Sequence, residues 1–204
     1  MTSEEINTFI SADNVHTPDE YRSFIAAVNQ QLGIPETQLF REKDFYEAPA
    51  STKFHGHFQC GLILHSLLLY KHLAELNDKL GCGYQTVDLW LAALYHDACK
   101  VNLYKTSLHN VKGLDGNWTH QVYYQVRSDY VGLGHGVESM AAYMRDFGNS
   151  PLYNEEVRDA IRWHMGFSDL SPMDSYNYGA YLERSKLVLL INTADLMAAN
   201  WDKV

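Results

Sequence analysis

Residues 57–80 read HFQCGLILHSLLLYKHLAELNDKL, and leucines recur in this stretch every three or four positions. That spacing places the leucines along one side of an α-helix. Gly81 and Gly83 follow directly and interrupt the pattern, because glycine destabilises a helix interior. The stretch therefore predicts a long, mostly apolar helix that ends near residue 80.

Further helices are predicted on both sides of this one. Residues 17–20 (TPDE) combine a capping hydroxyl, a proline at the first helical position and a glutamate three residues after the threonine. Gly33, with Pro35 beyond it, is expected to end that helix. Residues 36–56 are mixed and include a loop of small residues at 47–52. The other helices are predicted at residues 87–99, 136–147, 154–163 and 181–201.

Residues 104–127 have a different period. KTSLHNVK (105–112) and WTHQVYYQV (118–126) flank LDGN, and the second run alternates every two residues. An Asp-Gly or Gly-Asn turn between such runs is typical of a β-hairpin. The chain is therefore expected to be mostly helical, with a small inserted hairpin.

Length, charge and cysteine usage restrict the class of protein. With 204 residues, 46% of them hydrophobic, the chain can bury the core of one domain without disulfides. A formal net charge of -9 argues against general binding to nucleic-acid backbones. Cys60, Cys82 and Cys99 form no CxxC pair and are odd in number, which favours a reducing cytoplasm. MTSEEINTF has no signal-peptide pattern and residues 62–70 are too short an apolar run to span a bilayer, so we expect a soluble, cytoplasmic protein.

Ten histidines are many for a chain of this length, and several have apolar surroundings. His65 lies within GLILHSLLLY, and His164 and Asp195 each continue an apolar helical stripe. His135 stands between glycines, where it also fits a turn residue or a helix N-cap. Taken alone, His65 also fits a core histidine satisfied by one hydrogen bond to a backbone carbonyl.

His96 and Asp97 form an adjacent pair at the end of an apolar helix, in LAALYHDACK. Burying a carboxylate is costly unless it is paired or bound to a metal. An exposed helix end, with Lys100 beside the pair, is the alternative interpretation.

Five segments thus place an imidazole or a carboxylate where an apolar side chain would pack better. Convergence on bound metal explains all of them together. Nitrogen and oxygen ligands without thiolate suit Mn, Fe, Zn, Co or Mg better than a structural zinc site. The candidate ligands are His65, His96, Asp97, His135, His164 and Asp195. We expect the remaining six histidines to be surface or packing residues: His16, His55, His57, His72, His109 and His120.

The motifs GLILH, HDACK, GHGVES, IRWHMG and NTADLMA resemble, in this order, those of the HD-domain superfamily of metal-dependent phosphohydrolases. The resemblance covers roughly residues 55–200. It implies an all-α fold, an HD-domain helical bundle with a small inserted β-hairpin near residues 105–127 that lies over the pocket mouth. Residues 1–204 would form a single domain, with an N-terminal helical extension at 1–54 and a metal-binding core at 55–204.

The resemblance also assigns roles to residues. His65, His96, Asp97 and Asp195 match the mononuclear core of the superfamily. His135 and His164 match the additional histidines of dinuclear members, in which Asp97 bridges two metals, although mononuclear members also keep such histidines near the substrate. Cys99 stands where relatives often have glycine, and we expect it to make the site sensitive to oxidation.

The chemistry follows from charge. Two divalent ions would bring about +4 and the two aspartates about -2, so the site would attract an anion. Bound metal lowers the pKa of water to about 7 and clamps phosphoryl oxygens. The catalytic candidates are Asp97 and Lys100. The substrate-binding candidates are Lys100 and Arg162, which also fit solvated helix-end charges, and Arg127 and Glu138. Four hairpin aromatics either stack on a base or pack: Tyr104, Trp118, Tyr123 and Tyr124.

The leading hypothesis is therefore metal-dependent hydrolysis of a phosphate ester or anhydride in a small nucleotide-like substrate. A di-iron oxygenase of the same superfamily, with the same six ligands, is one alternative. A nucleotide-binding sensor without turnover is another, and exonuclease action on single strands is a third. No membrane partner and no general nucleic-acid partner is expected. The sequence is compatible with several bases, with one or two ions and with any oligomeric state.

Overall fold

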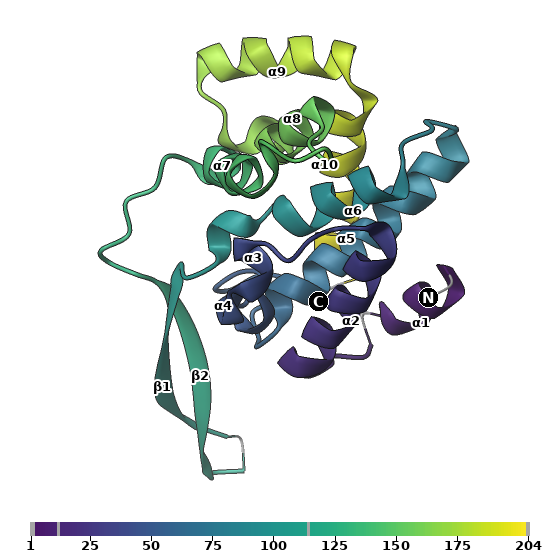
Figure 1. The fold of residues 1–204 in the computed structure, drawn as a ribbon. Coiled ribbons are helices and arrows are strands. Elements are labelled where there is room, and N and C mark those ends of the chain that lie inside the picture. Colours follow the sequence, from purple (N-terminus) through teal and green to yellow (C-terminus); the bar gives the residue numbers. More distant parts are fainter. Residues whose placement is uncertain (1–2, 12, 114, 203–204) are drawn as a thin grey trace.

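Helices make up the body of the molecule, and two strands form a hairpin that leaves it (Figure 1). The structure is a computed structural model and describes residues 3–11, 13–113 and 115–202. The α-helices are α1 (Ser3–Phe9), α2 (Pro18–Leu32), α3 (Gln38–Arg41), α4 (Lys43–Glu47), α5 (Gly61–Leu80), α6 (Thr86–Tyr95), α7 (His135–Phe147), α8 (Glu155–Trp163), α9 (Pro172–Arg184) and α10 (Lys186–Asn200). The strands are β1 (Tyr104–Lys112) and β2 (Trp118–Val126). The predicted all-α fold with a small hairpin is confirmed.

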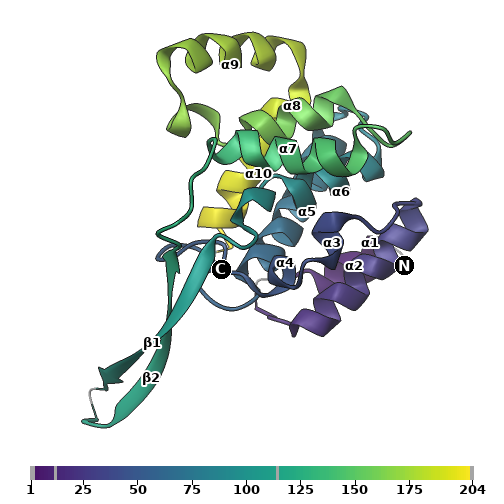
Figure 2. The same ribbon diagram turned by 60° about the vertical axis from the view of Figure 1, so that its left-hand side comes forward.

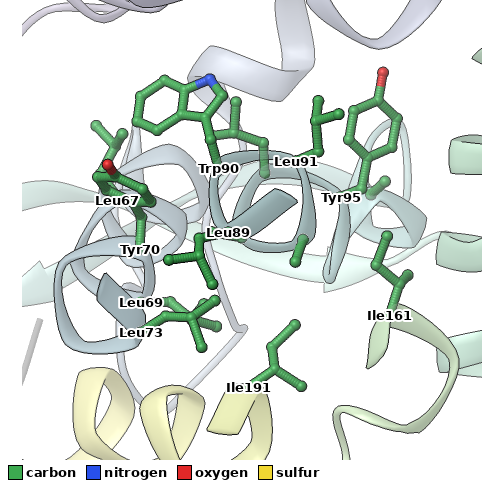
Figure 3. Close-up of a cluster of buried hydrophobic side chains, with 14 of the residues drawn as sticks. Leu67, Leu69, Tyr70, Leu73, Leu89, Trp90, Leu91, Tyr95, Ile161 and Ile191 are labelled. Atoms are coloured by element: carbon green, nitrogen blue, oxygen red, sulfur yellow. The ribbon is translucent and has the colours of Figure 1, made fainter. Parts of the chain in front are cut away.

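Helix α5 is the centre of the core. Every residue from Gly61 to Tyr70 is buried, because α6 and α10 pack against this helix. Figure 3 shows leucines of α5, Trp90 and Tyr95 of α6, Ile161 of α8 and Ile191 of α10 in one buried cluster. No helix in the described ranges combines the length and the apolar composition needed to cross a membrane.

The helix start predicted at residues 17–20 is present in α2. The Thr17 hydroxyl accepts a hydrogen bond from the Glu20 backbone N–H, and the Glu20 carboxylate accepts one from the Thr17 N–H. Gly33 ends the helix in the left-handed conformation with φ 69°, which glycine adopts without a Cβ clash. The predicted capping motif and the predicted helix end at Gly33 are therefore confirmed.

The helix predicted over residues 181–201 is present as α10, but its predicted start is wrong, because residues 181–184 belong to a separate helix, α9. α9 ends at Arg184, and Ser185 is extended, with φ -133° and ψ 118°. The Ser185 hydroxyl donates to Glu156 Oε2 at 2.8 Å, so this residue is held by α8 instead of continuing the helix. The start of α9 repeats the Thr17-Pro18 pattern, since the Ser171 hydroxyl accepts from the Asp174 N–H ahead of Pro172.

The helix predicted over residues 87–99 ends early. The α-helix stops at Tyr95, and a 3₁₀ helix (Ala98–Lys100) follows. Between them Asp97 leaves helical geometry, with φ -111° and ψ 20°. In an unbroken helix, neighbouring residues point about 100° apart. The break is what lets the side chains of His96 and Asp97 enter the same site.

The hairpin does not lie over the pocket mouth, so that expectation is wrong. In both Figure 1 and Figure 2 the hairpin projects away from the helices. Its register runs from the Tyr104–Val126 pair to the Lys112–Trp118 pair. None of its described residues lines the cavity of about 690 Å³ that contains Asp97 and Lys100. Trp118 is 67% exposed at the far end. The nine-pair antiparallel ladder carries these side chains away from the body.

A close backbone crossing at the start of α5 leads to a stability prediction. A Cβ on Gly61 would lie 2.0 Å from the carbonyl oxygen of Gly56, whereas a Cβ on Gly179 in α9 would meet nothing within 4 Å. We expect Gly61→Ala to lower the free energy of unfolding by about 3 kcal/mol. Gly179→Ala should raise it by about 0.5–1 kcal/mol, since alanine favours helix. Urea unfolding followed by circular dichroism measures both, and equal changes would contradict the crossing.

Candidate metal centre

Five separate segments bring the candidate metal ligands into one cluster. Helix α5 carries His65, the break after α6 carries His96 and Asp97, and α7 begins at His135. His164 directly follows α8, and Asp195 lies in α10. All six residues chosen from the sequence therefore lie together.

Asp97 belongs to two groups of three potential metal ligands, one with His65 and His96 and one with His135 and His164. Its Oδ2 lies 3.3 Å from Nε2 of His96 and 3.8 Å from Nε2 of His65. Its Oδ1 lies 2.6 Å from Nε2 of His135 and 3.7 Å from Nε2 of His164. Within each group the potential ligand atoms all lie within 4.8 Å of one another. Each carboxylate oxygen thus faces its own pair of imidazoles, an arrangement that can hold two ions with Asp97 between them.

Backbone carbonyls orient two of the imidazoles. His96 Nδ1 lies 2.7 Å from the Ala93 carbonyl oxygen, and His164 Nδ1 lies 2.7 Å from that of Ile161. These contacts place the ring proton on Nδ1 and leave Nε2 bare, as in many metal-binding histidines. The two Nε2 atoms are buried and make no hydrogen bond to any described residue. Since buried polar atoms are normally satisfied, the donor set fits a metal.

The Asp195 carboxylate meets His65 on the α10 side of the cluster. Its Oδ1 lies 3.0 Å from Nε2 of His65. Burial alone would raise the pKa of Asp195, but His65, with His96 and His164, holds it below its usual value. Asp195 is therefore an ionised oxygen donor.

Lys100 pairs with the shared carboxylate. Its Nζ lies 2.6 Å from Asp97 Oδ2. Burial would raise the pKa of Asp97, but Lys100, His96 and His135 hold it well below its ordinary value. Burial would lower the pKa of Lys100, yet the Asp97 charge raises it above its ordinary value. Both groups are charged at neutral pH.

A cavity of about 690 Å³ opens onto this cluster. Such a volume is ordinary for a small-molecule site. Its lining includes Asp97, Lys100, His135 and Asp195, whereas His65, His96 and His164 lie behind the surface, fully buried. The remaining described lining residues are Phe54, His55, His57, Phe58, Met165, Ser168, Asn192, Leu196, Ala199 and Asn200.

Three of the substrate-binding candidates lie elsewhere, outside the described lining of the cavity. The Arg162 guanidinium lies 4.1 Å from the ring centre of Trp163. Arg127 forms an exposed ion pair with Asp129, N–O distance 2.8 Å. Glu138 accepts hydrogen bonds from the Leu133 N–H and the Tyr130 hydroxyl. The structure brings Lys100 to the cavity, and not these three.

The segment FHGHF (residues 54–58) was not predicted to be part of the site. Four of its side chains line the cavity. The ring centre of His55 lies 4.7 Å from that of His65, and burial lowers the pKa of His55 to about 4, so its imidazole is neutral. The sequence signal for this segment is the pair His55 and His57, just before the helix that carries His65. The segment has no helical or strand periodicity from which its position in the fold could be predicted.

Cys99 lies beside the cluster but in protected surroundings. It is 9% exposed, and its Sγ lies 3.4 Å from Nδ1 of His135. Burial raises the pKa of its thiol to about 12. Since the thiolate is the reactive form, the expected sensitivity to oxidation does not follow from this environment.

Comparison with known proteins identifies the region that contains the cluster. A family model described as HD domain matches residues 62–200. This range covers more than half of the chain and contains all six clustered residues, but not the FHGHF segment. No curated protein and no solved structure matches the chain.

Proposed function

Since the chain belongs to the HD domain family, we propose that it is a metal-dependent phosphohydrolase. The substrate would be a phosphate ester or anhydride of a small nucleotide-like molecule. One observation carries the proposal: two groups of ligand atoms share Asp97 beside a charged Lys100, at a cavity of about 690 Å³.

The residues present would hold two divalent ions. His65 and His96 would serve one, with Asp195, and His135 and His164 the other, while Asp97 would contact both. Mn, Fe, Zn, Co and Mg all accept such donors. When bound, such ions lower the pKa of water to about 7 and neutralise charge on phosphoryl oxygens.

The chain's own groups define how a phosphate would be received. Lys100 lines the cavity with a partly buried side chain, and its three N–H donors exceed what Asp97 alone uses. We assign it to a phosphoryl oxygen of the substrate. Asp97 is held ionised and orients His135 through the 2.6 Å contact. The neutral His55 adds no positive charge that would compete with metal binding.

Lys100→Met tests that assignment. We expect kcat/KM for phosphate release to fall by roughly 10- to 100-fold, because a hydrogen bond to a charged group contributes about 1.5–3 kcal/mol. Metal content should stay unchanged, since Lys100 is not a ligand. Lys43→Met, at an exposed lysine paired with Glu47, is the control. A loss of metal in Lys100→Met would instead assign Lys100 to holding Asp97.

Elemental analysis of the purified protein, followed by phosphate release from a broad nucleotide panel, tests the proposed function. We expect about two ions per chain and release from at least one compound. Iron with a visible absorption band and oxygen uptake would support the oxygenase instead. Nucleotide binding without any product, across several metals, would support the sensor.

A further inference from the structure

The loop between α4 and α5 is a closed, internally bonded unit. Its base is held where the Cys60 N–H donates to the Glu47 carbonyl at 3.1 Å. Within it, the Ala50 N–H donates to the Gly56 carbonyl at 2.8 Å. The Ser51 hydroxyl donates to the His55 carbonyl at 2.8 Å, and Oγ of Ser51 accepts a hydrogen bond from the Phe54 N–H. These bonds give the loop a defined shape before any substrate arrives.

The loop presents aromatic and imidazole rings to the cavity. Phe54 is 78% exposed, although aromatic side chains are normally buried. Its carbonyl oxygen lies 2.8 Å from Nδ1 of His57, which fixes the backbone beneath the ring. Phe58 also lines the cavity and packs on the core. The His55 ring lies against that of the fully buried His65.

The cavity lining therefore combines two chemically different groups of side chains. Asp97, Lys100 and His135 are polar and charged, whereas Phe54, Phe58, Leu196 and Ala199 are apolar. An anionic group fits the first group and a flat, uncharged ring fits the second, since aromatic faces favour offset stacking.

We propose that Phe54, with Phe58, forms the stacking surface for the planar base of the substrate, whose phosphate lies beside Asp97 and Lys100. This inference rests on the proposed function, because it assigns the ring-binding part of the same site. It also relocates the base from the hairpin aromatics, whose described members do not line the cavity.

Binding without turnover tests the proposal. The probes are phosphonate analogues of AMP, GMP, CMP, UMP and ribose 5-phosphate, in which a CH₂ group replaces the ester oxygen. Calorimetric titration into the Mn²⁺-loaded protein gives each Kd. Stacking of one base on an aromatic side chain corresponds to roughly 5- to 150-fold in affinity. We expect at least one nucleotide analogue to bind about tenfold or more tightly than the ribose analogue.

Variants locate the side chain responsible for the affinity ratio, which is the Kd of the ribose analogue divided by that of the nucleotide analogue. Phe54→Ala should reduce it to about twofold or less, and Phe54→Trp should keep it, because indole also stacks. Tyr176→Ala is the matched control, since Tyr176 in α9 is also 78% exposed and lies outside the described cavity lining. Trp118→Ala should leave the ratio unchanged. A loss in Trp118→Ala with Phe54→Ala unaffected would overturn the proposal and place the base on the hairpin.

The two proposals fail in different ways. Equal binding of all five probes, or no binding of any nucleotide analogue, overturns the stacking surface. A ratio that depends on Phe54, without phosphate release from any corresponding ester, supports the stacking surface and contradicts the hydrolase. Phosphate release at equal kcat/KM from ribose 5-phosphate and the nucleotides supports the hydrolase and overturns the stacking surface.

Discussion

Asp97→Asn is expected to lower kcat/KM for phosphate release by about 10³-fold, the order expected for loss of one preorganised electrostatic group. Asp97 contributes to both groups of potential ligand atoms, so the variant weakens both ion positions at once. The amide is neutral, and it also leaves the Lys100 ammonium without its 2.6 Å partner. Metal content should fall from about two ions per chain to one or none.

Phosphate release and elemental analysis on the same preparation check this result. Asp129→Asn is the control, because Asp129 is an exposed aspartate paired with Arg127, away from the cluster. It should keep both metal content and rate. Asp97→Asn protein that retains two ions and a kcat/KM within tenfold of the unchanged protein would contradict the bridging role.

Trp90→Ala is expected to lower the free energy of unfolding by about 4 kcal/mol, in the range measured for such truncations. Trp90 is fully buried, and its ring centre lies 4.8 Å from that of Tyr70 and 6.3 Å from that of Phe24 (Figure 3 shows Trp90 and Tyr70). The truncation leaves a large void between α2, α5 and α6. It also removes the indole N–H that donates to Asn29 Oδ1 at 2.8 Å, in the core.

Chemical denaturation followed by circular dichroism measures the loss. Trp201→Ala is the control, because Trp201 is 71% exposed and its removal should change the free energy by less than about 0.5 kcal/mol. Trp90→Phe should fall between the two, since it refills part of the void without the hydrogen bond. A loss below about 1 kcal/mol for Trp90→Ala would mean that the core relaxes around the site.

The sequence was most informative where a polar residue interrupts an apolar pattern. His65, His164 and Asp195 stand on stripes that must be buried, and a buried imidazole or carboxylate requires a partner. That physical requirement does not depend on knowing the topology. The structure brings these residues together with His96, Asp97 and His135, as the sequence had predicted.

Cavity-lining residues that lie in loops cannot be predicted from interruptions of an apolar pattern. Phe54 and His55 lie in a segment without periodicity, and their position depends on hydrogen bonds between residues several positions apart. Arg162 is a charge that the sequence offers for neutralising a phosphate, but its guanidinium contacts Trp163 and Asp174 in the folded chain. The break at Ser185 depends on a bond to Glu156 in another helix, which no local pattern reveals.

The crossing of Gly56 and Gly61 has a consequence for redesign of the chain. Because a Cβ at Gly61 would collide with the Gly56 carbonyl, this contact fixes where the loop joins the start of α5. Positions beyond it, such as exposed Lys53 and Phe54, are free of that constraint. Libraries aimed at a new substrate can therefore randomise the loop tip while both glycines stay constant. Such libraries would leave the helix that carries His65 in place.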